Sequence, residues 1–193
     1  MMRKLVLFGD SNTYGYDPRD FFGGRYNEEY RWASIVSKAL KDQFLVLEEG
    51  QNGRVLPSIQ SRFFQELVLG IESGDVLIMM LGTNDILLSS KPNVDATLKK
   101  LDAILSYVKE NCKGEFFLIA PPYISDMYPD LKPYHECCIK LNQGYMELAN
   151  KYHIKAVDAA LWEIPMAADG VHFSMEGHVR FSEHILEIIN FSK

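Results

Sequence analysis

A serine near the start of the chain and an aspartate and a histidine near its end are residue types that together make a nucleophile. Ser11 follows a hydrophobic run over residues 5–8, while Asp169 and His172 stand near the other end. A serine hydroxyl is a weak nucleophile until a histidine takes its proton, and a carboxylate can stabilise the imidazolium that forms. If the fold brings the two ends together, these three residues form the catalytic triad of a serine hydrolase.

Acyl transfer by a serine also needs hydrogen-bond donors for the negative oxygen that develops. The backbone N–H groups of Ser11 and Gly53 and the side-chain amide of Asn84 are candidates for this oxyanion hole. Glycine suits a place where the backbone must approach a ligand closely. Each feature alone has a simpler interpretation, because Asn84 could be a turn residue and Asp169 a helix cap. Their joint occurrence at the ends of predicted strands favours catalysis.

The elements that must position these residues are short apolar runs that alternate with longer segments of helical period. This alternation predicts an α/β fold, a three-layer α/β/α sandwich around a five-stranded parallel sheet. Ligands of such sheets bind beyond the carboxyl ends of the strands. A flavodoxin-like strand order 2-1-3-4-5 makes the ends before Ser11, Gly53 and Asn84 neighbours. The predicted strands cover residues 4–9, 44–48, 76–81, 116–120 and 154–158.

Apolar stripes at helical spacing predict the helices between these strands. One stripe consists of Ile59, Phe63, Leu67 and Leu69, and the last helix begins after an N-cap at Ser174. Two long loops, residues 11–30 and 121–134, are expected to wall a pocket. Asp10 and Asp85 are expected to fix their loops, and His178 to be a packed or hydrogen-bonded structural residue. The other stripes lie over residues 32–40, 98–108, 142–152 and 175–191.

Size and composition indicate an ordinary globular protein with a single domain over residues 1–193. Of the 193 residues, 47% are hydrophobic and 24% charged, and the net charge is -6. The chain has no basic cluster, which argues against a nucleic-acid partner. Its three cysteines have no metal-ligand spacing, so we expect reduced thiols, a cytoplasmic location and no metal or cofactor. The apolar run over residues 5–8 is too short for an export signal or a membrane span.

Four motifs of the sequence resemble those of the SGNH (GDSL-like) hydrolase family, in order, over essentially the whole chain. They are FGDSNTYG, EEGQNGRV, MLGTNDI and DGVHFSMEGH. The resemblance implies Ser11 as nucleophile, Gly53 and Asn84 as oxyanion donors, and Asp169 and His172 as the other triad members. It also implies a flavodoxin-like sandwich, because the Gly-x-Ser-x-Gly elbow of α/β-hydrolases is absent.

One position departs from the family pattern. Asn12 stands where many members have leucine, and we expect it to add polarity beside the nucleophile. The EEG before the glycine motif and the pair Arg31-Trp32 are similar to the branch of bacterial arylesterases and carbohydrate esterases.

The substrate is expected to be a small-molecule carboxylic ester with a short or acetyl acyl group. Asn12, Tyr14 and Tyr123 are the candidate substrate-binding residues. The aromatic residues of the first loop could form a pocket wall or, with equal weight, pack a satellite core or a homo-oligomer interface. They are Tyr14, Tyr16, Phe21, Phe22, Tyr26, Tyr30 and Trp32.

Other functions stay open at this point. The same site could cleave acyl-CoA thioesters or lysophospholipids. From another class, the chain could be a flavodoxin-like nucleotide-binding protein that holds phosphate at residues 11–13 without hydrolysis. The lack of a Gly-x-Gly-x-x-Gly fingerprint counts against dinucleotides.

Overall fold

The computed structural model describes residues 2–20, 22–89 and 91–191, so Phe21 of the first predicted loop lies outside the described residues. Five parallel strands form one sheet in the order β2-β1-β3-β4-β5. This is the predicted order, and each strand lies within one or two residues of its predicted position. The strands are β1 (Arg3–Gly9), β2 (Phe44–Gly50), β3 (Val76–Met80), β4 (Glu115–Ala120) and β5 (Lys155–Asp158).

The register of the sheet aligns the strand ends that precede the three amino-terminal motifs. Gly9 at the end of β1 pairs with Gly50 of β2 on one side and with Met80 of β3 on the other. Every residue of β3 is buried, as expected for a central parallel strand covered on both faces. The serine, glycine and asparagine motifs therefore leave the same edge of the sheet.

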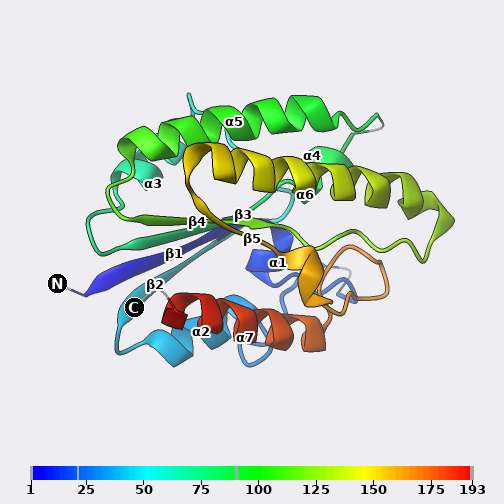
Figure 1. Cartoon of the computed structure of the whole chain (residues 1–193). Coiled ribbons are helices and arrows are strands. Elements are labelled where there is room, and N and C mark those ends of the chain that lie inside the picture. The colour runs from blue at the N-terminus through cyan, green and yellow to red at the C-terminus, as the bar shows by residue number, and fades with distance from the viewer. Residues whose placement is uncertain (1, 21, 90, 192–193) are drawn as a thin grey trace.

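Two layers of helices cover the sheet (Figure 1). Helices α3 (Arg62–Leu69), α5 (Val94–Asn111) and α6 (Lys132–Tyr152) lie on one face, and α2 (Trp32–Leu40) and α7 (Met175–Phe191) on the other. Each face has its own core of buried apolar side chains, which confirms the three-layer sandwich. The short helices are α1 (Ser11–Tyr14), α4 (Thr83–Leu87), η1 (Pro129–Leu131) and η2 (Ala159–Trp162).

Two helix predictions need correction. The structure starts α6 at Lys132, ten residues before the predicted position, because Pro133 is tolerated in the first turn of a helix. In α3 the buried residues are Phe64 and Val68, whereas Phe63 of the predicted stripe is exposed. Adjacent helical residues point about 100° apart, so Phe63 and Leu69 of the predicted stripe face away from the core, whereas Leu67 packs against it partly buried.

The last helix agrees with its prediction. Helix α7 begins at Met175, and the Ser174 hydroxyl accepts a hydrogen bond from the Gly177 N–H over 3.0 Å as an N-cap does. None of the helices within the described ranges combines the length and hydropathy needed to cross a membrane.

Candidate active site

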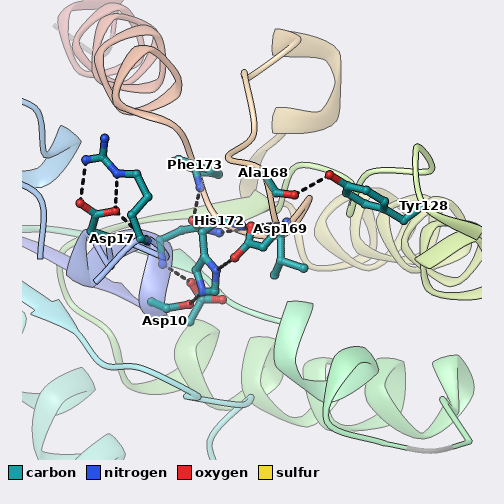
Figure 2. Close-up of polar contacts among 11 residues, drawn as sticks. Asp10, Asp17, Tyr128, Ala168, Asp169, His172 and Phe173 are labelled. Atoms are coloured by element: carbon teal, nitrogen blue, oxygen red, sulfur yellow. Dashed lines mark hydrogen bonds and ion pairs between the residues drawn. The ribbon is translucent and has the colours of Figure 1, made fainter. Parts of the chain in front are cut away.

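The structure brings the serine and the aspartate–histidine pair from opposite ends of the chain into one row. Ser11 is the first residue of α1, directly beyond β1, and His172 lies in the loop before α7. The Oγ atom of Ser11 is 3.0 Å from Nε2 of His172, and Nδ1 of His172 is 2.5 Å from Oδ2 of Asp169. Figure 2 shows the Asp169 carboxylate beside the imidazole ring. This is the arrangement in which a histidine can deprotonate a serine.

The loop that carries Asp169 is built to hold the carboxylate charged. Burial alone would raise the pKa of Asp169, but hydrogen bonds from the His172 ring and from the backbone N–H groups of His172 and Val171 hold it below its usual value. Both backbone bonds are 3.0 Å long and end on Oδ1. Gly170 adopts a positive φ of 71°, which glycine favours. With Nδ1–H facing a carboxylate, the Nε2 atom is left to accept the proton of Ser11.

Asn12 lies in the interior, with only 6% of its surface exposed. Its Nδ2 donates to the carbonyl oxygen of Val171 over 3.3 Å, and its Oδ1 accepts from the N–H of Phe173 over 2.8 Å. The backbone of His172 thus lies between two hydrogen bonds to the residue that follows Ser11. Both ends of the amide contact the loop that carries His172, so the polar group expected to bind the substrate bonds to the histidine loop.

Two of the three proposed oxyanion donors, Gly53 and Asn84, lie in segments that are joined by a hydrogen bond. Gly53 adopts φ 72° and is exposed, and the space around its Cα is open. Asn84 is buried in α4, and its Nδ2 donates one hydrogen bond to the carbonyl oxygen of Arg54 over 3.1 Å. An amide nitrogen carries two hydrogens, so one remains for a ligand.

Sequence reasoning missed the part played by Arg54. Its guanidinium donates to the carbonyl oxygens of Gly9 (2.9 Å) and Glu49 and to Oε1 of Gln51 (3.1 Å). It also lies 4.4 Å from the ring centre of Phe8. These contacts fasten the glycine loop to the ends of β1 and β2. The sequence does show an arginine directly after Gly53. Which backbone carbonyl groups its side chain contacts, however, depends on the fold.

Asp10 and Asp85 fix loops, as predicted. Oδ1 of Asp10 accepts from the N–H of Asn12 over 3.0 Å, and Oδ2 of Asp85 accepts from the N–H of Leu56 over 2.8 Å. Burial raises the pKa of Asp10 to about 6, against the lowering effect of its backbone hydrogen bond and of nearby His172. The Asp10 carboxyl group is thus close enough to His172 to feel its charge.

His178 is packed as predicted, but it is not hydrogen-bonded. The ring is fully buried. Its centre lies 5.4 Å from the ring centre of Tyr26 and 5.3 Å from that of Phe173. Neither ring nitrogen has a hydrogen-bond partner among the described residues. Burial lowers the pKa of His178 to about 3, so the ring is neutral at ordinary pH.

The aromatic residues of the long loops separate into two groups. Trp32 and Tyr26 are buried, which agrees with the core interpretation. Tyr16 lies against His172, with 4.6 Å between the two ring centres. The hydroxyl of Tyr128 donates to the carbonyl oxygen of Ala168 over 2.7 Å, from the second long loop (Figure 2).

The candidate substrate residues Tyr14 and Tyr123 are both half-buried. The ring of Tyr14 lies 4.4 Å from the guanidinium of Arg25, and the ring of Tyr123 meets His135 at 5.4 Å. Among the described residues, neither has a ring contact with His172. Their part in substrate binding stays a prediction.

A parallel α/β/α sandwich with a serine, a histidine and an aspartate at its strand ends defines a class of hydrolase. The sequence matches the GDSL-like lipase/acylhydrolase family over residues 7–180. The chain belongs to this family and is a carboxylic ester hydrolase, as the resemblance of its motifs implied.

Solved structures with the same fold include three esterases. Est24, a carbohydrate acetylesterase from Sinorhizobium meliloti, is 21% identical with a TM-score of 0.80, over 99% of this chain and 100% of that one. The aryl esterase of M. smegmatis is 20% identical with a TM-score of 0.77, and the match covers 96% of this chain and 99% of that one. Axe2, an acetylxylan esterase from Geobacillus stearothermophilus, was solved as a catalytic mutant and is 18% identical with a TM-score of 0.72, over 96% and 93%. Comparison with curated protein sequences gives no match.

Proposed function

We propose that this protein hydrolyses short-chain carboxylic esters, acetyl esters above all, through an acyl-enzyme on Ser11. The observation that carries the proposal is the hydrogen-bonded row from Asp169 through His172 to the Ser11 hydroxyl. Each contact has the length and the partners that nucleophilic catalysis by serine requires. The membership of the chain in a family of ester hydrolases supports the same reaction.

In the first step, Nε2 of His172 takes the proton of Ser11 as Oγ attacks the ester carbonyl carbon. The carbonyl oxygen becomes an oxyanion, which accepts hydrogen bonds from the N–H groups of Ser11 and Gly53 and from the Asn84 amide. The Asp169 carboxylate, held charged by its hydrogen bonds, stabilises the imidazolium. Collapse of the intermediate breaks the bond to the alcohol, which leaves with the proton from His172.

In the second step, water replaces the alcohol. Nε2 of His172 takes a proton from the water as its oxygen attacks the acyl carbon on Ser11. The same donors stabilise the second oxyanion, and the proton returns to Oγ as the carboxylic acid leaves. The enzyme is regenerated without a cofactor in this scheme.

One consideration favours a small acyl group, and a second concerns the alcohol part of the ester. The solved structures similar to this chain include a carbohydrate acetylesterase and an acetylxylan esterase. The surroundings of the row also include the aromatic ring of Tyr16, which suits contact with an aryl or sugar alcohol. Thioesters and lysophospholipids stay as alternatives on the same site. A nucleotide-binding role has less support, because the hydroxyl of Ser11 faces His172.

A substrate panel tests the proposal. Purified protein is assayed with p-nitrophenyl esters of rising chain length, acetylated xylose, acetyl-CoA and a lysophospholipid, each beside Ser11→Ala. We expect the highest kcat/KM with acetyl esters and no turnover by the variant. A preference for acyl-CoA or lysophospholipid would move the assignment to the corresponding alternative. Equal hydrolysis by Ser11→Ala would rule out Ser11 as nucleophile.

The sequence-based expectations of a cytoplasmic location, a single functional domain and a homo-oligomer stay predictions. The three cysteines, Cys112, Cys137 and Cys138, are unpaired in the structure, which fits a reducing compartment. Size-exclusion chromatography with light scattering measures the oligomeric state directly.

A further inference from the structure

We infer that Asn12 is a positioning residue that holds His172 in place relative to Ser11. The inference rests on the proposed function, since it concerns the same nucleophile and base. It assigns to Asn12 a part different from the substrate contact that the sequence analysis expected.

All four polar groups of Asn12 are engaged in hydrogen bonds. Its N–H donates to Oδ1 of Asp10 over 3.0 Å, and its carbonyl oxygen accepts from Nε1 of Trp32 over 2.9 Å. The Trp32 ring is buried in the core between the sheet and helices α2 and α7. The backbone of Asn12 is therefore fixed to the core before its side chain makes any contact.

The side chain extends this fixed point to the histidine loop. Nδ2 bonds to the carbonyl oxygen of Val171 and Oδ1 to the N–H of Phe173, the residues on either side of His172. Two bonds of this geometry restrain both the position and the tilt of the backbone between them. Phe173 is itself fully buried against Phe181, so the loop meets the core at that residue.

The consequence is a closed ring of contacts around the reacting atoms. Ser11 precedes Asn12 in the chain, and the 3.0 Å contact from its Oγ to Nε2 of His172 closes the ring from the other side. Ser11 and His172 are 161 residues apart, so their approach depends on tertiary contacts alone. A misplacement of about 1 Å between reacting groups can lower a rate about a hundredfold. A leucine, the usual residue of the family at this position, has neither the donor nor the acceptor.

The variant Asn12→Leu removes both side-chain bonds at similar volume. We expect kcat for p-nitrophenyl acetate to fall at least about tenfold, with KM changed less than about twofold, because both ends of the amide bond to the histidine loop. The rate at which a fluorophosphonate labels Ser11 should fall in parallel. A variant that raises KM at constant kcat would instead show a substrate contact, and unchanged kcat and KM would remove Asn12 from the site. Either outcome overturns the inference.

Asn142→Leu is the matched control. Asn142 is another fully buried asparagine whose Nδ2 makes two hydrogen bonds, to the carbonyl oxygen of Pro121 (2.9 Å) and to Oδ1 of Asp158 (2.7 Å). It lies in α6, outside the triad contacts. We expect Asn142→Leu to lower Tm while kcat per folded molecule is kept. If both variants lose kcat only in proportion to Tm, Asn12 has a merely structural part and the inference is wrong.

A measurement on the wild type covers the case in which Asn12→Leu does not fold. Hydrogen exchange by NMR reports whether the N–H of Phe173 is protected, as its bond to Oδ1 of Asn12 requires. Fast exchange of that amide contradicts the inference whatever the enzyme hydrolyses. Failure of the proposed function gives a different result: the wild type neither turns over any ester of the panel nor reacts with the fluorophosphonate, while the amide of Phe173 stays protected.

Discussion

The side-chain amide of Asn84 donates a hydrogen bond of 3.1 Å to the backbone carbonyl oxygen of Arg54. Arg54 directly follows Gly53, whose N–H is the other proposed donor from the middle of the chain. This bond ties the asparagine motif to the glycine motif. The bond therefore restrains the separation of these two proposed donors before the substrate arrives.

Asn84→Ala is expected to lower kcat about a hundredfold to a thousandfold, as loss of one oxyanion donor does in serine proteases. KM should change much less, because the donor acts on charge that develops during the reaction. Steady-state kinetics with p-nitrophenyl acetate measure both constants. The control is Asn93→Ala, which removes the N-cap of α5 and should cost about 1 kcal/mol of stability without changing kcat. Similar kcat values for the two variants would contradict the assignment of Asn84.

Arg54→Lys tests whether the glycine loop must be fastened to the sheet. A lysine keeps the charge but cannot supply the forked donors that reach Gly9, Glu49 and Gln51 together. We expect kcat to fall by roughly tenfold as the oxyanion donors lose their fixed position. In Arg54→Ala, added guanidinium ion should restore part of the rate. Arg62→Lys, at an exposed ion pair with Glu66, serves as the control and should leave kcat unchanged.

Burial of Asp10 should make stability depend on pH in a definite direction. Its pKa in the folded protein is raised to about 6 from 3.8. Its contribution to stability is therefore complete below about pH 3.8 and is lost as the pH rises through about 6. In Asp10→Asn this loss is absent. From pH 4 to pH 8, the free energy of unfolding of the variant should therefore rise by about 2 kcal/mol relative to that of the wild type. Urea unfolding at both pH values measures the difference, and a constant difference would contradict the prediction.

The same substitution should lower activity. The nearby His172 is one of the groups that lower the pKa of the Asp10 carboxyl group, against the effect of its burial. In the proposed mechanism His172 becomes an imidazolium, and Asp10→Asn removes a negative charge close to it, so kcat of Asp10→Asn should fall.

His178 should make the protein less stable as the pH falls, whereas Asp10 makes it less stable as the pH rises. The pKa of His178 in the folded protein is lowered to about 3 from 6.5, so its contribution is present above pH 6.5 and is lost as the pH falls toward about 3. Protonation of this group in the unfolded chain should cost about 2 kcal/mol of stability between pH 7 and pH 5. His178→Leu removes no hydrogen bond of the native structure. Between pH 7 and pH 5 its free energy of unfolding should therefore fall by about 2 kcal/mol less than that of the wild type. An identical pH dependence in both proteins would show that His178 does not titrate as described.

Much of the fold could be predicted because the central strands of a parallel sheet are strongly apolar. The buried run of β3 and the Ser174 cap of α7 are local signals, and both led to correct predictions. The start of α6 and the buried face of α3 were predicted wrongly. Pro133 is a breaker inside a helix but is tolerated in its first turn, and Phe63 and Phe64 are equally apolar, so only packing decides which one is buried.

The site divides in the same way. Ser11, His172 and Asp169 could be proposed from their types and motifs, and the geometry brings them together. Asn12 and Arg54 could not be assigned, because their contacts join segments far apart in the sequence. The contacts of such positioning residues are set by the tertiary structure, and distances in the tertiary structure cannot be obtained from a single sequence.

The acyl-enzyme is the central claim of this account, and mass spectrometry of the protein during turnover tests it most directly. The wild type, quenched in acid while it hydrolyses p-nitrophenyl acetate, should carry one acetyl group on the peptide that contains Ser11. Ser11→Ala, folded to the same extent by circular dichroism, should carry none and release no p-nitrophenol above the uncatalysed rate. Turnover by the variant, or an acetyl group of the wild type on a residue other than Ser11, would contradict the account.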